Sequence, residues 1–139
     1  HWKPCSPTLG SAVMTITLKD IRAVIAAIKM SPEAISSVVA DFQSRGIRRI
    51  KDLRRQIGAL RGDSQRVGLH LIHRANAPLE PELLWRLLNS PDAHVAGLAI
   101  GVASYCHKGA LAERTLRALD HRECDNLRSG MVSLLSHVW

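Results

Sequence analysis

The feature that most constrains the fold of this chain is the helical spacing of its apolar residues. Aliphatic side chains return every three or four positions, as they do in the stripe Ile47, Ile50, Leu53, Ile57 and Leu60. Side chains at that spacing share one face of an α-helix, and an apolar face of that kind packs against a core. No convincing alternation with a period of two is found, so strands are not required. The predicted fold class is all-α.

Residues that favour helix starts and ends divide this pattern into eight segments. These residues are Thr17 with Asp20, Ser31-Pro32-Glu33, Gly46, Gly62, Asn76 with Pro78, Ser90-Pro91-Asp92 and Lys108-Gly109. The first resembles a capping box, and the two Ser-Pro sequences offer a capping hydroxyl followed by proline at the first helical position. The expected helices span about 17–29, 32–45, 48–61, 63–75, 80–89, 92–107, 110–119 and 124–138.

The eight expected helices pair into four similar hairpins. In each, a large aliphatic residue near the end of the first helix is followed seven or eight positions later by an inward aliphatic of the second helix. The pairs are Ile28 and Ile35, Leu60 and Val67, Leu88 and Val95, and Leu119 and Leu127, with second members 32, 28 and 32 residues apart. A unit recurring at that length is typical of an α-solenoid, although a helical bundle with short loops can show similar spacing.

Two interhelical turns carry a family resemblance. Residues 88–95 (LNSPDAHV) and 119–127 (LDHRECDNL) place an aliphatic residue, a short acidic or proline-containing turn and a Val or Leu in succession. This order resembles the turn of HEAT-type helical repeats, most closely over 80–139 and less closely over 48–75. The resemblance implies a short right-handed α-solenoid of about four antiparallel hairpins, whose second helices line the concave side.

Length and composition predict a single domain without a membrane span. A chain of 139 residues falls in the size range of one domain, which we expect over 14–139, with 1–13 as a tail. The longest apolar stretch, 95–106, has twelve residues, whereas a spanning helix needs about 20. Three scattered cysteines are too few for a disulfide framework, which predicts a reducing, cytoplasmic location. The arginine-rich, lysine-poor composition favours a bacterial source.

Positive charge is concentrated in residues 45–74. Nine basic and two acidic residues there give a net charge of +7, and the rest of the chain is balanced. Arg48, Arg49, Lys51 and Arg55 alternate with the aliphatic stripe and are therefore expected to project outward. Arginine suits bidentate contact with carboxylates or phosphates. The alternative interpretation is an ordinary solvated helix face.

A second candidate surface depends on the repeat register. If the hairpins are equivalent, their second helices align residues in two columns: Ala34, Arg66, His94 and Asn126, then Asp41, His73, Gly101 and Ser133. Arg66, His70, His73, His94 and Asn126 would then form a polar surface for binding a partner. Ordinary solvation of these positions is the alternative.

Catalytic chemistry has little support in the sequence. His70 and His73 are three residues apart and could share a metal, but only with a further ligand such as Cys106 or His107. Cys124 lies near basic residues, yet no oxyanion-hole motif, P-loop or dinucleotide fingerprint accompanies it. No catalytic residue, metal or cofactor is therefore predicted.

These observations predict a non-enzymatic protein-binding module of the adaptor, chaperone or toxin-neutralising type. Its concave or basic helical surface would dock an acidic protein partner. The alternative is a nucleic-acid-binding helical-repeat protein that contacts phosphates through the basic residues of 45–74.

Overall fold

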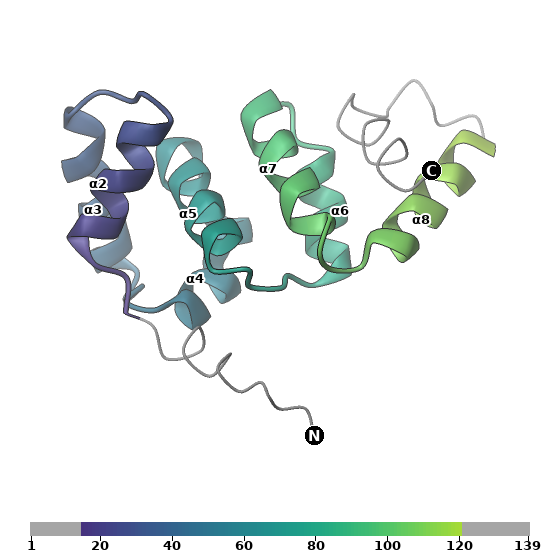
Figure 1. Cartoon of the computed structure of the whole chain (residues 1–139), viewed down its shortest axis with the longest axis horizontal. Helices are drawn as coiled ribbons and strands as arrows, with labels where there is room; N and C mark the ends of the chain where they lie inside the picture. The colour runs from purple at the N-terminus through teal and green to yellow at the C-terminus, as the bar shows by residue number, and fades with distance from the viewer. Residues whose placement is uncertain (1–14, 121–139) are drawn as a thin grey trace. The chain divides into compact units, whose positions relative to one another are not determined.

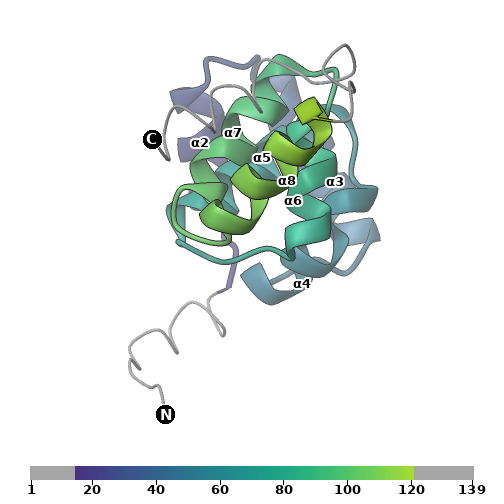
Figure 2. The ribbon, with the colours of Figure 1, turned by 90° about the vertical axis from the view of Figure 1, so that its right-hand side faces the viewer.

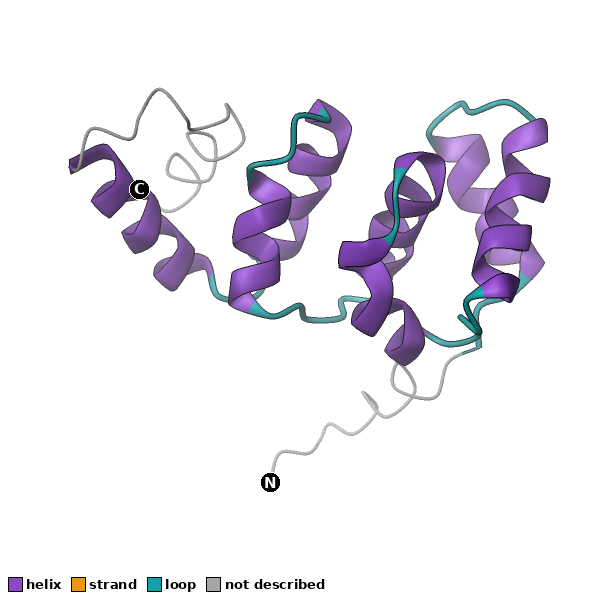
Figure 3. Cartoon of the chain, turned by 180° about the vertical axis from the view of Figure 1, so that it is seen from behind, coloured by secondary structure: helices purple, strands orange, loops and turns teal. Residues whose placement is uncertain are grey.

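The computed structural model describes residues 15–120, whose regular secondary structure is helical. Seven α-helices lie in this range (Figures 1 and 3): α2 (Leu18–Ala27), α3 (Glu33–Ser44), α4 (Ile50–Gln56), α5 (Gly62–Arg74), α6 (Pro81–Leu88), α7 (Ala93–Ala103) and α8 (Lys108–Asp120). A 3₁₀ turn, η2 (Ile57–Ala59), follows α4 directly. The all-α prediction is confirmed for these residues. The expected helix 124–138 and the expected tail 1–13 lie outside them.

Side chains cap two of these helices at their N-termini. At α2, the Thr17 hydroxyl accepts from the Asp20 amide at 3.1 Å, and the Thr17 amide donates to Asp20 Oδ2 at 3.0 Å, which confirms the capping box. At α7, Asp92 Oδ1 accepts from the His94 amide at 2.9 Å. The capping hydroxyls predicted for the two Ser-Pro sequences are therefore wrong. Asp92 replaces Ser90 as the cap, and α3 begins after Pro32 without a side-chain cap.

The expected helix ends are confirmed at two positions and shifted at others. Gly46 follows α3 with φ of 70° and Asn76 follows α5 with φ of 52°, both in the left-handed region that ends helices. Gly62 is also left-handed but begins α5 instead of ending a helix. The break predicted at Lys108-Gly109 is wrong because α7 ends at Ala103 and α8 starts at Lys108. His107 takes the left-handed conformation between them, with φ of 58°.

The contacts divide the chain into two compact units, His1–Ala77 and Pro78–Trp139. In the first unit, α5 packs against α2, α3 and α4. The predicted stripe on α4 and η2 is buried in full, from Ile47 to Leu60. Gly68 permits the close approach of α5, since a Cβ there would lie 2.8 Å from Ile57 Cδ1 and 3.0 Å from Leu53 Cδ1.

In the second unit, α6 packs against both α7 and α8 (Figure 2). Arg114 of α8 donates to Glu82 of α6 through Nη1 at 2.8 Å, and its guanidinium lies 4.4 Å from the centre of the Trp85 ring. The buried Thr115 hydroxyl donates to the Leu111 carbonyl at 2.9 Å. The contacts of Arg114 therefore join α8 to α6, whereas the Thr115 bond lies within α8.

The aliphatic pairs predicted for the hairpins differ in burial. Leu60, Val67, Leu88 and Val95 are buried, as expected for the second and third hairpins. Ile28 and Ile35 are only half-buried, so the first hairpin buries its predicted pair less completely than expected. The buried side chains of this hairpin instead include Val24, Ile25 and Val38. Val24 and Ile25 lie about one helical turn before Ile28, and Val38 lies about one turn after Ile35. The fourth pair, Leu119 and Leu127, is not among the residues whose side chains the structure describes.

The long apolar stretch 95–106 is a buried helix over most of its length, because α7 buries Val95, Ala96, Ala99, Val102 and Ala103. None of the helices found between residues 15 and 120 combines the length and the apolar character that crossing a bilayer demands.

Candidate partner-binding surface

The candidate site is a group of cationic side chains on and just before α4, called here the α4 basic surface. It consists of Arg45, Arg48, Arg49, Lys51, Arg54 and Arg55. The stripe from Ile47 to Leu60 packs against the core, so the basic residues that lie between its members project away from it. All six side chains are exposed except Arg54, which is half-buried. The structure thus places Arg48, Arg49, Lys51 and Arg55 at the surface, and their role in binding stays a prediction.

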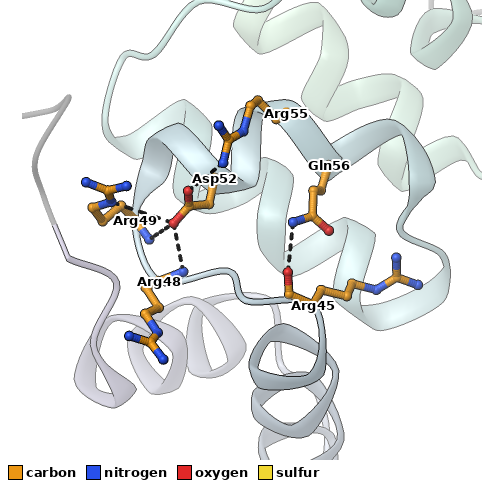
Figure 4. A network of polar contacts seen from close by, with 6 residues as sticks. All are labelled: Arg45, Arg48, Arg49, Asp52, Arg55 and Gln56. Carbon is orange, nitrogen blue, oxygen red and sulfur yellow. Dashed lines mark hydrogen bonds and ion pairs between the residues drawn. The ribbon is translucent and has the colours of Figure 1, made fainter.

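Asp52 is the polar centre of this surface (Figure 4). It is only 6% exposed, and its Oδ2 accepts from the backbone amides of Arg48 and Arg49, at 3.2 Å each. Arg55 Nη2 donates to Oδ1 at 2.9 Å, and Arg49 Nε lies 3.6 Å from Oδ2. Because arginine has no acceptor, Arg49 cannot cap α4 with its own side chain. Asp52 therefore holds the segment that leads into α4.

Opposing effects act on the pKa of Asp52. Burial raises it, whereas the amide hydrogen bonds from Arg48 and Arg49 and the charge of Arg49 lower it. The lowering effects prevail, so the pKa lies below its ordinary value of 3.8. Asp52 is consequently ionised at neutral pH, when it can hold its arginine partners.

Arg45 joins α3 to the end of α4. Its Nε donates to Asp41 Oδ1 on α3 at 2.9 Å, and its backbone carbonyl accepts from Gln56 Nε2 at 2.9 Å (Figure 4). Burial raises the pKa of Asp41, but hydrogen bonds with Arg45 and Ser64 outweigh it and leave the pKa lowered. The two contacts of Arg45, with Asp41 and with Gln56, therefore hold the C-terminal end of α3 against α4.

The carboxylates nearby neutralise only part of this charge. Residues 41–55 contain six cations and two carboxylates, Asp41 and Asp52, which gives a formal net charge of +4. Between residues 15 and 120, no hydrogen bond or ion pair engages the Arg48 guanidinium or the Lys51 ammonium. Figure 4 shows the Arg48 side chain directed away from Asp52. These two side chains are therefore available to a partner.

An open apolar groove of about 590 Å³ adjoins this surface and is called here the Leu18 groove. Its lining includes Ile16, Leu18, Val39, Phe42, Ile47 and Arg48. The Ile16 amide donates to the Arg48 carbonyl at 2.7 Å, which holds one wall against the segment before α4. A second depression, lined by Arg48, Arg49 and Asp52, shares residues with the groove. The groove was not predicted from the sequence. The apolar residue Leu18, one helical turn before the buried Ile21, could have indicated it.

The polar surface predicted from the repeat register is brought together only in part. Arg66, His70 and His73 occupy successive turns of α5 and share one face. Arg66 is half-buried and its Nη1 lies 2.6 Å from Asp63 Oδ1. His94 is exposed in the second unit, whereas Asn126 lies outside the described residues. Ala34 is buried, so the first column does not reach the surface there, contrary to expectation.

The residues considered for metal or thiol chemistry do not converge. Among residues 15–120, no group of three His, Cys, Asp or Glu side chains is arranged to hold a metal ion. Cys106 is half-buried, and its thiol donates to the Val102 carbonyl at 3.4 Å. Cys124 lies outside the described range.

The described residues define an all-helical protein with an arginine-rich surface beside an apolar groove. Comparisons with known protein families, with curated proteins and with solved structures all find no match.

Proposed function

We propose that this protein is a non-enzymatic protein-binding module that docks an acidic partner through the α4 basic surface. The observation that carries the proposal is the net charge of +4 at this surface, where five of the six cationic side chains are exposed. Among the described residues, the Arg48 and Lys51 side chains make no hydrogen bond or ion pair that the fold would lose on binding. Exposed charges of one sign attract a partner of the opposite sign and accelerate its association.

The neighbouring groove favours a protein over a nucleic acid. Phosphates would satisfy the arginines equally well, and the net charge of +7 over 15–77 keeps nucleic acid as the second candidate. A duplex backbone, however, offers no aliphatic side chain for the Leu18 groove. A protein partner supplies both carboxylates and apolar groups, and so matches both features.

We also propose that the helices are HEAT-like hairpins of a short right-handed α-solenoid. Two features support it: α3 packs against α5, and the aliphatic pairs of the second and third expected hairpins are buried. Small-angle scattering of the full chain tests this proposal. A solenoid predicts a profile elongated relative to a sphere of equal volume, and a spherical profile would contradict it.

Capture experiments with three forms of the full chain test the function. Wild type, Arg48→Glu/Lys51→Glu and the control Arg22→Glu/Arg86→Glu are used as baits in a nuclease-treated lysate of the source organism. Both double variants change exposed residues and reverse the same amount of charge. We expect an acidic protein that wild type and control retain and the α4 variant loses.

Purified partner then gives the affinity. We expect the α4 variant to weaken binding at least tenfold, with wild-type binding falling as salt rises. Equal capture by all three baits would contradict the proposal. Binding to generic duplex DNA that the α4 variant abolishes, without any protein partner, would establish the nucleic-acid alternative instead.

A further inference from the structure

We infer that the Leu18 groove and Arg48 form one peptide-binding site. Its ligand is a segment of the acidic partner in which an aliphatic or aromatic side chain is flanked by Asp or Glu. This inference rests on the proposed function and specifies which part of the partner is recognised.

The groove has the size and lining of a binding site. Its volume of about 590 Å³ lies within the range of about 300–1,000 Å³ that is common for ligand pockets. The walls come from the first turn of α2, from Val39 and Phe42 on the later turns of α3, and from Ile47. Phe42 and Ile47 are held in the core, so this floor is preformed. A preformed apolar floor favours binding because little must be ordered.

Leu18 supplies apolar surface that the described fold leaves uncovered. It is 45% exposed and stands at the first position of α2. Only Leu18, Tyr105 and Leu116 are exposed large apolar residues within the described range, and of these only Leu18 borders the groove. Covering Leu18 with an apolar side chain would remove this surface from water, which is favourable.

The positive charge at the rim of the Leu18 groove defines which group the ligand must carry next to its apolar side chain. Arg48 lines both the groove and the depression that continues toward Arg49. Its guanidinium can therefore reach a carboxylate next to a residue seated in the groove. Guanidinium–carboxylate pairing can be bidentate, which fixes orientation as well as charge.

The length over which the positive charge extends favours a polypeptide ligand. The α4 basic surface runs from Arg45 to Arg55, and a net charge of +4 over that length matches several carboxylates spaced along a chain. A small amphiphile carries one or two charges. Residues 1–14 of this protein contain Lys3 and no acidic residue, so they lack the complementary charge.

Selection and binding experiments test the site. A random-peptide library displayed on phage is panned against the full chain at low salt, and the consensus peptide is synthesised. We expect enrichment of sequences that place Leu, Ile or Phe beside Asp or Glu. Enrichment without apolar residues, or no enrichment, would overturn the inference.

Matched variants then locate the peptide. Leu18→Gln should weaken binding about tenfold, and Leu18→Ala less, because both remove apolar contact area. Leu116→Gln is the control, since Leu116 is 41% exposed and lies on α8. It should leave the affinity unchanged. Equal affinities for Leu18→Gln and Leu116→Gln would overturn the inference. Arg48→Gln should weaken binding and reduce its salt dependence.

The outcomes separate this inference from the proposed function. If Arg48→Glu/Lys51→Glu abolishes capture of the partner while Leu18→Gln does not, the protein binds an acidic partner but not through the groove. If neither variant matters, both proposals fail. Sedimentation that shows a dimer lost in Leu18→Gln would assign the groove to a second copy of this chain and overturn the inference.

Discussion

Residues 15–77 and residues 78–120 bury similar aliphatic cores but use arginine differently. The first range contains twelve basic and five acidic residues, a net charge of +7, and the second contains four and five, a net charge of −1. In the second, Arg114 joins α8 to α6 by contacting both Glu82 and Trp85. In the first, Arg48 and Lys51 reach solvent. The contrast shows that the charges of Arg48 and Lys51 are not used by the described fold, and these are the charges that the proposed partner would contact.

The largest expected effect tests whether the two cores are equivalent. Leu53 and Leu84 are both fully buried, one in each unit. We expect Leu53→Ala and Leu84→Ala each to lower the free energy of unfolding by about 2–5 kcal/mol, through lost burial and the cavity left behind. Denaturant unfolding followed by circular dichroism measures this. A loss well below that range for one variant alone would show that the cores are not equivalent.

Asp52 tests whether the first unit depends on its buried carboxylate. Asp52→Ala removes the acceptor of two backbone amides and of Arg55. We expect a loss of about 1–3 kcal/mol, because buried donors would be left unsatisfied. Asp52→Asn, which keeps one acceptor oxygen, should lose less in the same unfolding experiment. If Asp52→Ala is as stable as wild type, the carboxylate does not hold the segment before α4.

The lowered pKa of Asp52 also predicts a pH dependence. A carboxyl whose pKa is lower in the folded than in the unfolded protein stabilises the fold above its unfolded value, here 3.8. That contribution disappears as the pH falls through the folded value. Wild type should therefore lose stability on acidification below about pH 4 more steeply than Asp52→Asn. Some slope should remain in the variant, because the pKa values of Asp20 and Asp41 are lowered as well. Identical slopes would contradict this role for Asp52.

The smallest expected effect tests the arginine contact of the second unit. Arg114→Ala removes the contact with Trp85, and we expect a loss of about 0.5–1 kcal/mol from that contact. Arg117→Ala is the control, because Arg117 is exposed and its contact with Glu113 on the same helix is long, at 4.0 Å. It should change stability little, since exposed ion pairs contribute little. If both variants lose the same free energy of unfolding, Arg114 has no special structural role, and the proposed difference between residues 15–77 and 78–120 is contradicted.

Local signals in the sequence predicted much of this architecture. The capping box formed by Thr17 and Asp20 and the buried stripe from Ile47 to Leu60 depend on residues within a few turns of one another. The sequence also predicted which side of α4 faces solvent, because helical geometry relates each arginine to that stripe. The HEAT-like register rested on repeat spacing alone, and the first pair that it predicted, Ile28 and Ile35, is only half-buried.

By itself, the sequence determined the all-helical class of residues 15–120, most helix boundaries and the basic, outward face of α4. These properties follow from side-chain spacing, backbone propensity and charge within short segments. Only the tertiary structure decided that Leu18, Phe42 and Arg48 border one groove and that Arg114 lies over Trp85. These residues meet because helices pack, and packing brings together side chains that no periodicity along the chain relates.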